Sequence, residues 1–274
     1  MTFSFMDHSR LEEEMQLLKA TGVPFAMATV VRTVDATSAK PGGRALIDLE
    51  GKILTGWVGG GCATQAVGKA AREAIKTGKP QFISLRPQEL LETEGLVAGE
   101  IRDGVRFSPN GCPSKGTMDI FVEPILPLLK MVICGTGLVA MALAELATRL
   151  DFKVSIHAAS IHTKRDDIIQ GFDFEAPDFV VVATQGQGDT DALRAAISGS
   201  SEYVSFVGSL RKFETITAKI IAENAELGPE IKKVRAPAGL KIDAITPVEI
   251  AMSILAEIIQ VRRGKFATRE RNDV

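Results

Sequence analysis

One apolar segment constrains the fold of this chain more than any other. Residues 178–184 read Asp-Phe-Val-Val-Val-Ala-Thr, an almost unbroken apolar run. Strands that are buried on both faces, as in a parallel sheet covered by helices, have this composition. From residue 130 onward, predicted strands and helices alternate, which is typical of a doubly wound sheet. The sequence therefore predicts an α/β fold with a parallel sheet in its C-terminal half.

The segment Pro-Ile-Leu-Pro at 124–127 predicts a stiff joint between two domains. Before it, we expect helices at 6–21 and 63–77 and strands at 24–32, 44–49, 53–58, 81–85 and 117–123. After it, we expect strands at 130–134, 153–157, 178–184 and 202–208, and helices at 138–150, 191–197, 213–226 and from 246. Residues 87–110 show no clear pattern. We predict a mixed α/β domain over residues 1–127 and a Rossmann-like domain over residues 128–274.

The composition excludes several functional classes. The net charge is -2, so no basic excess indicates nucleic-acid binding. We find no run of apolar residues long enough to span a membrane and no secretory signal, and we expect a cytoplasmic protein. The chain has 3 cysteines without a CxxC pair and only 3 histidines. This pattern predicts free thiols and no dedicated metal site.

A glycine run that ends in a cysteine is the first candidate site. Gly59, Gly60 and Gly61 precede Cys62, and a helix is predicted directly afterwards. Glycines let the backbone approach a ligand closely, and a helix N-terminus favours anions, a thiolate included. We expect Cys62 to hold or attack a ligand. The alternative is a buried cysteine in a tight turn between a strand and a helix.

The other two cysteines have different surroundings. Cys112 lies in a second glycine-containing loop, where Lys115 would favour its thiolate. Two loop cysteines in one domain suggest a shared pocket lined by thiols, with Cys62 and Cys112 as its candidates. Cys134, in contrast, lies inside a predicted strand and is expected to be a small core residue.

A dinucleotide fingerprint opens the C-terminal domain. Gly135, Thr136 and Gly137 begin a G-x-G-x-x-A pattern that ends at Ala140, between a predicted strand and a predicted helix. The pattern predicts a phosphate-binding turn, or a turn that only closes the corner between sheet and helix. NAD binding also requires an acidic residue after the next strand, and residues 158–160 are Ala-Ala-Ser. We therefore expect no ordinary use of NAD(P).

Further polar residues follow predicted strands. Gly208 and Ser209 end one strand and are candidates for phosphate contact or for a plain turn. Asp189 and Asp191 follow the strand at 178–184, where α/β sheets place ligands, although we prefer helix capping for Asp191. In the N-terminal half, three basic side chains around one loop are candidate phosphate contacts or solvated charges: Arg32, Lys40 and Arg44.

Four stretches of the chain carry motifs that occur together in one family. They are residues 28–33 with 41–44, residues 59–62, residues 208–212, and residues 237–240 with 246–251 and 253–257. In order and spacing they resemble the xanthine dehydrogenase accessory factor family, XdhC/CoxI. Residues 111–124 resemble its carbon monoxide dehydrogenase branch. The resemblance covers nearly the whole chain.

The resemblance implies a chaperone for the molybdenum cofactor rather than a catalyst. Family members are thought to bind the cofactor as molybdopterin or its cytosine dinucleotide, protect it, support its sulfuration and deliver it. The implied partners are an apo molybdenum hydroxylase, of xanthine dehydrogenase or carbon monoxide dehydrogenase type, and a cysteine desulfurase, and we expect a homodimer. Cys62 would be a thiolate contact to molybdenum or a sulfur carrier.

The sequence departs from the family pattern at three places, which are Ala63-Thr64, residues 158–160 and Gln185. Two alternative functions remain open. One is an NAD(P)-dependent oxidoreductase that uses the glycine fingerprint. The other is a cofactor-free docking scaffold in which the Rossmann domain is vestigial.

Overall fold

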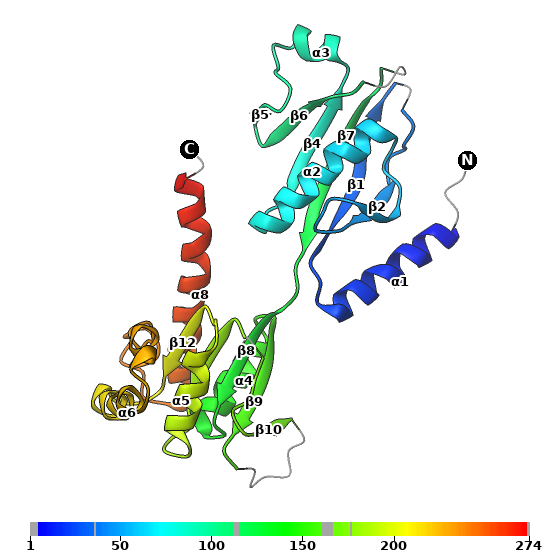
Figure 1. The fold of residues 1–274 in the computed structure, drawn as a ribbon. Coiled ribbons are helices and arrows are strands. Elements are labelled where there is room, and N and C mark those ends of the chain that lie inside the picture. Colours follow the sequence, from blue (N-terminus) through cyan, green and yellow to red (C-terminus); the bar gives the residue numbers. More distant parts are fainter. Residues whose placement is uncertain (1–4, 36, 112–114, 161–166, 176, 273–274) are drawn as a thin grey trace. The chain divides into compact units, whose positions relative to one another are not determined.

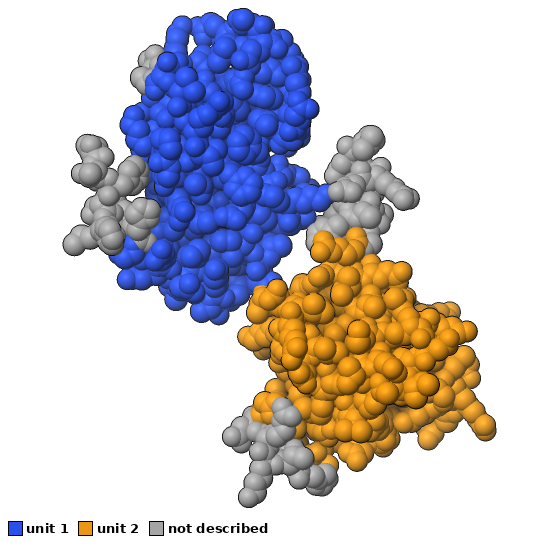
Figure 2. All heavy atoms as spheres, turned by 180° about the vertical axis from the view of Figure 1, so that it is seen from behind, with its two compact units in different colours: residues 1–127 blue, residues 128–274 orange. Residues whose placement is uncertain are grey.

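The protein is described here by a computed structural model that covers residues 5–272, except residues 36, 112–114, 161–166 and 176. The chain forms two compact units, unit 1 with residues 1–127 and unit 2 with residues 128–274 (Figure 2). No helix within the described ranges is both long and apolar enough to cross a membrane.

Unit 1 is built on a seven-stranded sheet with the strand order β3-β2-β1-β7-β4-β6-β5 (Figure 1). All neighbouring strands are antiparallel except β4 and β6. The strands are β1 (Phe25–Val34), β2 (Arg44–Ile47), β3 (Ile53–Gly56), β4 (Gln81–Arg86), β5 (Ile101–Arg102), β6 (Val105–Pro109) and β7 (Thr117–Ile125). The helices are α1 (Phe5–Thr21), α2 (Gly61–Thr77) and α3 (Gln88–Thr93).

The two faces of this sheet are covered differently. Helix α2 packs through an alanine-rich stripe onto the face that includes Ala28, Val30 and Ile120. Because side chains alternate along a strand, Phe25 lies on the opposite face, where it packs with Leu11 of α1. We call the face opposite α2 the open face. Helix α1 packs on it near β2 and β3, and α3 packs on it at β6, where Leu91 contacts Phe107.

A close contact between two glycines seats α2 on the sheet. A Cβ atom built on Gly51, in the β2–β3 turn, would lie 2.6 Å from the carbonyl oxygen of Gly68, and a Cβ on Gly68 would overlap Gly51. Beside this contact, Arg72 Nη1 donates a 2.8 Å hydrogen bond to the carbonyl oxygen of Glu50. Both glycines are therefore required for α2 to lie this close to the turn.

Unit 2 is a five-stranded parallel sheet with the order β10-β9-β8-β11-β12. Its strands are β8 (Leu129–Cys134), β9 (Phe152–Ala158), β10 (Ile168–Gln170), β11 (Phe179–Val182) and β12 (Tyr203–Phe206). Its helices are α4 (Leu138–Thr148), α5 (Asp189–Ser198), α6 (Leu210–Glu223), α7 (Gly228–Ile231) and α8 (Pro247–Asn272), with a short 3-10 turn, η1 (Ala225–Leu227). The strand order switches at β8: β9 and β10 are added on one side of it, and β11 and β12 on the other, as in doubly wound folds.

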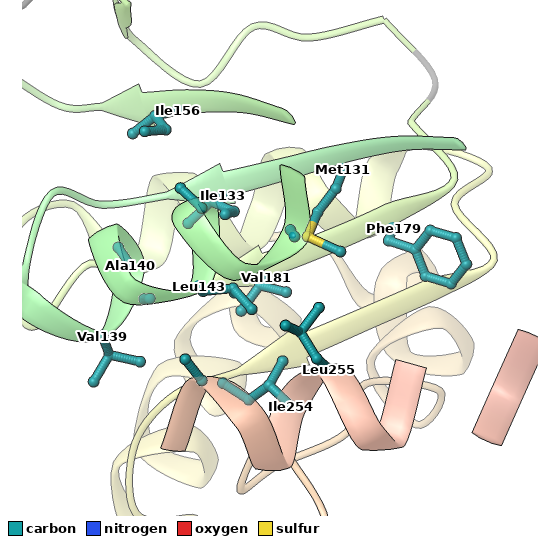
Figure 3. Close-up of a cluster of buried hydrophobic side chains, with 14 of the residues drawn as sticks. Met131, Ile133, Val139, Ala140, Leu143, Ile156, Phe179, Val181, Ile254 and Leu255 are labelled. Carbon is teal, nitrogen blue, oxygen red and sulfur yellow. The ribbon is translucent and has the colours of Figure 1, made fainter. Parts of the chain in front are cut away.

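Helices cover both faces of this sheet, as the apolar run at 178–184 predicts. Leu143 of α4 and Ile254 of α8 pack with Val181 on one face (Figure 3). On the other face, Phe213 of α6 packs in one apolar cluster with Val180. The α/β prediction, with a parallel Rossmann-like sheet in the second half, is confirmed. The start of α8 is also confirmed, because Thr246 Oγ1 accepts from Glu249 N–H and Glu249 accepts from Thr246 N–H.

Short elements without a strong periodic signal were not predicted. They are α3, β5 and β6 within residues 87–110, and β10, η1 and α7 in unit 2. The strict alternation of strands and helices after residue 130 was also wrong in part, because no helix separates β10 from β11 in the described residues. Instead, Phe172 and Phe174 from this connection pack against the core beside α5 and α6.

We predict that Gly68→Ala destabilises the protein. Alanine in a helix interior is normally about 1 kcal/mol more favourable than glycine. Here the added methyl group meets the backbone of Gly51, and overpacking of this kind costs about 1–3 kcal/mol. Urea unfolding of both proteins measures the change. Gly228→Ala, at a helical position with open space around it, is the control and should be neutral or stabilising. A neutral or stabilising Gly68→Ala would contradict this role of the glycine pair.

We also predict that unit 2 loses stability on acidification through His157. Burial lowers the pKa of this side chain, despite its hydrogen bond to the Gly171 carbonyl and the nearby charge of Asp173. The unfolded chain therefore takes up a proton below about pH 6.5 that the folded state resists, and stability falls with pH in that range. Unfolding free energies at about pH 7.5 and pH 5.5 should differ less in His157→Asn than in the unmodified protein. Equal differences would contradict the prediction.

Candidate functional site

The glycine run before Cys62 forms the turn that enters α2. Gly59 has φ +125°, a conformation that side chains disfavour, and Gly60 is the extended residue that precedes the helix. Cys62 is the second residue of α2 and is exposed. The structure thus contradicts the alternative of a buried cysteine and places the thiol at the solvent-facing start of a helix.

Neighbouring segments hold this turn in place. Gly60 N–H donates a 3.3 Å hydrogen bond to Ser38 Oγ. A Cβ on Gly59 would lie 2.9 Å from Cβ of Ala63 and 3.2 Å from Cε of Met118. Any larger residue at position 59 would therefore push the turn away from β7. These contacts hold the turn close to β7 and so fix the position of the α2 N-terminus.

The N-terminus of α2 is open to an anion. Gly60 supplies no side-chain cap, and the first turn contains no acidic residue. The first N–H groups of a helix have no partners within the helix, and the helix dipole adds partial positive charge there. An anionic group beside Cys62 would meet both effects.

The second predicted loop does approach the first. A Cβ on Gly111 would lie 3.6 Å from Sγ of Cys62. Asn110 anchors this loop, because its N–H donates to the carbonyl of Arg86 and its Nδ2 donates to the carbonyl of Gly116, both at 2.6 Å. Cys112 itself lies outside the described residues, so a pocket shared by two thiols stays a prediction.

The basic residues predicted near these loops have distinct positions. Lys115 Nζ lies 2.6 Å from Glu89 Oε1, so its charge is paired there. Arg32 contacts Asp119, while Arg44 begins β2 and is exposed, as is Lys40.

The only tryptophan of the chain lies close to this turn. Trp57 precedes Gly59 by two residues, and 42% of its surface is exposed. Its fluorescence can therefore report on a ligand bound beside Cys62.

In unit 2, the fingerprint glycines serve packing within the protein. Gly135 has φ +123°, and a Cβ there would lie 2.6 Å from the carbonyl carbon of Ala183. This glycine therefore permits β8 and β11 to approach each other at their carboxyl ends. A Cβ on Gly137 would lie 2.6 Å from Cδ of Gln185, so the Gln185 amide already fills the space that this glycine leaves. Thr136 lies between them, in the loop that enters α4.

Two further places in unit 2 bear on dinucleotide binding. Residues 158–160, after β9, contain no acid that could hold a ribose. A Cβ on Gly188 would lie 2.9 Å from the ring of Phe172 and 3.1 Å from Cβ of Ala159. These contacts give the glycines a packing role within unit 2, and the expectation that it makes no ordinary use of NAD(P) stays a prediction.

Gly208 and Ser209 form a local turn. Ser209 Oγ accepts a 3.3 Å hydrogen bond from Lys212 N–H and so caps α6. A Cβ on Gly208 would lie 2.6 Å from the ring of Phe206. These contacts explain the turn without a ligand, and phosphate contact there stays a prediction.

A buried aspartate at the same edge was not singled out as a partner of α6 from the sequence. Asp189 accepts hydrogen bonds from Thr184 Oγ1 and from Gly186 N–H, and Lys212 Nζ lies 2.5 Å from its Oδ2. Burial raises the pKa of this carboxyl, but the hydrogen bonds from Lys212, Thr184 and Gly186 outweigh it and hold the pKa below its usual value. The pair ties the N-termini of α5 and α6 together. Asp189 and Lys212 lie on different helices and are not neighbours in the sequence, so this ion pair could not be predicted from residue spacing.

Cys134 is a core residue, as predicted. It is fully buried in β8, and burial raises the pKa of its thiol to about 12. No group of three or more His, Cys, Asp or Glu side chains that could hold a metal occurs in the described ranges.

The C-terminal motif residues converge on one buried carboxylate. Glu257 of α8 accepts hydrogen bonds from Tyr203 Oη at 2.6 Å and from Gly239 N–H at 3.0 Å. Arg235 Nη1 lies 3.3 Å from its other oxygen. Glu257 thus joins the last helix to the edge of the sheet. This contact brings residues 237–240 and 253–257 together.

Two protein-family models match this chain, one within unit 1 and one within unit 2. A model of the XdhC and CoxI family matches residues 18–86, and a model of the XdhC Rossmann domain matches residues 131–258. A crystal structure described as a xanthine dehydrogenase from Bacillus halodurans aligns with 92% of this chain and 95% of its own, with a TM-score of 0.44 and 20% identity.

Two curated relatives are longer than this chain. The chain is 27% identical over 280 residues to the uncharacterized protein YqeB of Escherichia coli K12, covering 95% of this chain and 46% of that protein. It is 29% identical over 163 residues to a probable xanthine dehydrogenase component of Bacillus subtilis 168, covering 54% and 47%. The chain thus spans less than half the length of each. Because both family models match, and in the order of the two units, this chain belongs to the XdhC/CoxI family.

Proposed function

We propose that this protein is an accessory factor for a molybdenum hydroxylase of the xanthine dehydrogenase type, and that unit 1 binds the molybdenum cofactor. One observation carries the proposal. Within a member of this family, an exposed thiol, that of Cys62, lies at the uncapped N-terminus of α2. The name of the Bacillus subtilis relative, a probable xanthine dehydrogenase component, supports the choice of partner.

The residues present fit the chemistry of this cofactor. Molybdopterin carries a phosphate, and its cytosine dinucleotide form a pyrophosphate, and free N–H groups at a helix start bind such anions. The thiolate of Cys62 is a soft ligand suited to the metal centre, and bound cofactor would supply molybdenum with its dithiolene sulfurs. The N–H groups of Gly61 and Cys62 would orient the phosphate, while Gly60 N–H donates to Ser38 Oγ and holds the turn. Cys112 is proposed as a second thiol at this site.

Protection, sulfuration and delivery of the cofactor are part of the proposal. The partners would be the apo-hydroxylase and a cysteine desulfurase, with the protein acting as a homodimer in the cytoplasm. A phosphate-cradle role for Gly135, Thr136 and Gly137 gains no support from the geometry, because Gln185 fills the space over Gly137. The proposal therefore assigns cofactor binding to unit 1, and phosphate contact at Gly208 and Ser209, in unit 2, stays a separate prediction.

A cofactor-free docking scaffold is the second candidate. The close contacts at Gly137 and Gly188 support it, since both glycines have a packing role within unit 2 that needs no cofactor. The two candidates differ in whether the protein carries a pterin.

We predict that the protein retains pterin after expression in a host that makes molybdenum cofactor, and that Cys62→Ser loses it. Serine keeps the size of the side chain but is a poor ligand for a soft metal centre. The pterin is oxidised to its fluorescent derivative and quantified per protein chain. Trp57 fluorescence should fall on addition of cofactor, because Trp57 lies near the turn.

Cys134→Ala is the matched control, since it removes a buried thiol from unit 2 and should leave the pterin content unchanged. Retention of pterin by Cys62→Ser would contradict the role of Cys62. If neither the unmodified protein nor the control carries pterin, and added cofactor leaves Trp57 fluorescence unchanged, the docking scaffold is the better description.

A further inference from the structure

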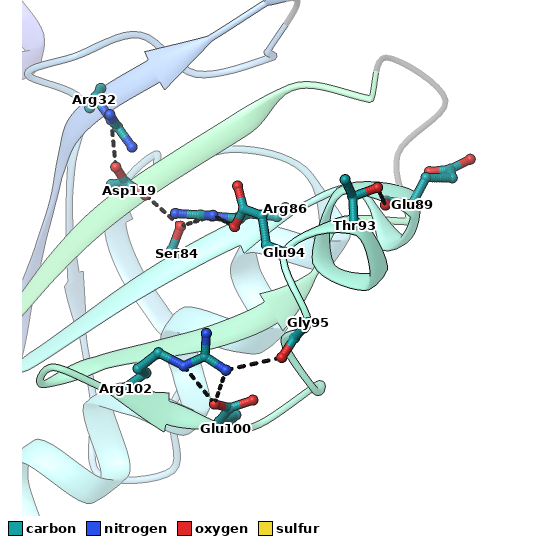
Figure 4. A network of polar contacts seen from close by, with 10 residues as sticks. All are labelled: Arg32, Ser84, Arg86, Glu89, Thr93, Glu94, Gly95, Glu100, Arg102 and Asp119. Carbon is teal, nitrogen blue, oxygen red and sulfur yellow. Dashed lines mark hydrogen bonds and ion pairs between the residues drawn. The ribbon is translucent and has the colours of Figure 1, made fainter.

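A buried carboxylate lies in the middle of the unit-1 sheet, on the open face. Asp119 belongs to β7, between β1 and β4, and is 5% exposed. Ser84 Oγ donates a 2.6 Å hydrogen bond to its Oδ1, and Arg32 Nε donates a 2.6 Å hydrogen bond to its Oδ2 (Figure 4). A buried charge is costly unless it is paired, and both oxygens of Asp119 have partners.

A β-bulge aims Arg32 at this carboxylate. Ala28 and Val30 of β1 face α2, and regular alternation would place Arg32 on that same buried face. The pairing of β1 with β7 shifts between Val30 and Arg32, so that Arg32 lies opposite Asp119 instead. Bulges that redirect a side chain are frequent near functional sites. The bulge moves the guanidinium to the open face.

The contact leaves most donors of Arg32 available. Only Nε donates to Asp119, and within the part of the chain that the structure describes the two Nη groups make no hydrogen bond. The side chain is 59% exposed, whereas that of Asp119 is 7% exposed. A guanidinium anchored at Nε presents its outer N–H groups as a rigid fork. Arg32 meets Asp119 through this one hydrogen bond and not through a two-point contact, so its Nη groups are not used to pair the carboxylate.

A second arginine lies on the same face. Arg44 of β2 pairs with Thr29 of β1, and paired residues on neighbouring strands share a face. Thr29 in turn pairs with Phe121, two residues after Asp119 on β7. Arg32 and Arg44 thus share this face with two carboxylates, because Glu123 lies four residues after Asp119 on β7 and faces the same side. At the exposed guanidinium of Arg32 itself, a doubly charged anion gains more Coulomb energy than a singly charged one.

The other arginine of this network has its charge satisfied. Arg86 Nε donates to Ser84 Oγ at 3.1 Å, and its Nη1 pairs with Glu94 (Figure 4). Its guanidinium also lies 4.8 Å from the ring centre of Phe107. The hydrogen-bonded chain from Arg86 to Ser84 to Asp119 thus holds Arg32 from behind.

We propose that Arg32, assisted by Arg44, is a binding site for a phosphate group on the open face of unit 1. The site lies on the face of the sheet opposite α2, the helix that carries Cys62. It therefore does not rest on the cofactor role proposed for Cys62, and neither proposal falls with the other.

The test is a titration of the full chain with inorganic phosphate, followed by the ¹⁵N–¹H signal of Arg32 Nε. A saturable shift of this signal is expected, with weaker binding of acetate, which carries a single charge. Arg32→Lys keeps the charge but loses the fork, and should weaken phosphate binding, followed by ³¹P line width, by about tenfold or more. Arg149 directly follows α4, is exposed and pairs with Glu145, so Arg149→Lys is the control and should bind phosphate as the unmodified protein does.

Three results would overturn the proposal: no saturable shift, equal affinity for acetate and phosphate, or unchanged phosphate binding by Arg32→Lys. Thermal unfolding of each variant confirms that it is folded. The Nε titration uses the unmodified protein, so it tests phosphate binding at Arg32 even if a variant is unstable.

Discussion

The close approach of Gly68 to Gly51 is the contact on which the rest of unit 1 depends. It lets α2 lie against the β2–β3 turn at backbone distance, and Arg72 reinforces the same contact. With the helix seated there, its first residues meet the loops at one end of the sheet. Cys62 comes beside Gly111, and Ser38 holds the turn that precedes it. The position of the exposed thiol therefore follows from a backbone contact near the middle of the helix.

Glycines play a different part in unit 2. Gly135 brings β8 against β11, and Gly137 makes room for the side chain of Gln185. Both are positions at which dinucleotide-binding domains approach a pyrophosphate. Here the protein's own atoms occupy them, while Asp189 and Lys212 lock the adjacent helices together. The same motif thus supports a well-packed Rossmann unit, in which α4, like α2, begins after a glycine without a side-chain cap.

The sequence predicted those parts of the fold that depend on local patterns. The apolar run at 178–184 and the capping box at Thr246 both correspond to observed elements. It missed what depends on pairing between distant strands. The bulge that redirects Arg32 exists only because β1 pairs with β7, and the contact of Asp189 with Lys212 joins two helices across a strand. The glycine fingerprint predicted the turn correctly. It could not predict that the Gln185 side chain lies against Gly137, because a rotamer is not encoded in the spacing of residues.

If Cys62 lies at the cofactor site, bound cofactor should protect its thiol from alkylation. The structure offers an internal reference, because Cys62 is exposed while Cys134 is buried and its pKa is raised to about 12. Iodoacetamide modification of each cysteine is followed by mass spectrometry of peptides, with and without molybdenum cofactor. We predict that Cys62 is modified rapidly, that the cofactor slows this modification strongly, and that Cys134 is inert in both samples. Modification of Cys62 at the same rate with saturating cofactor would contradict it.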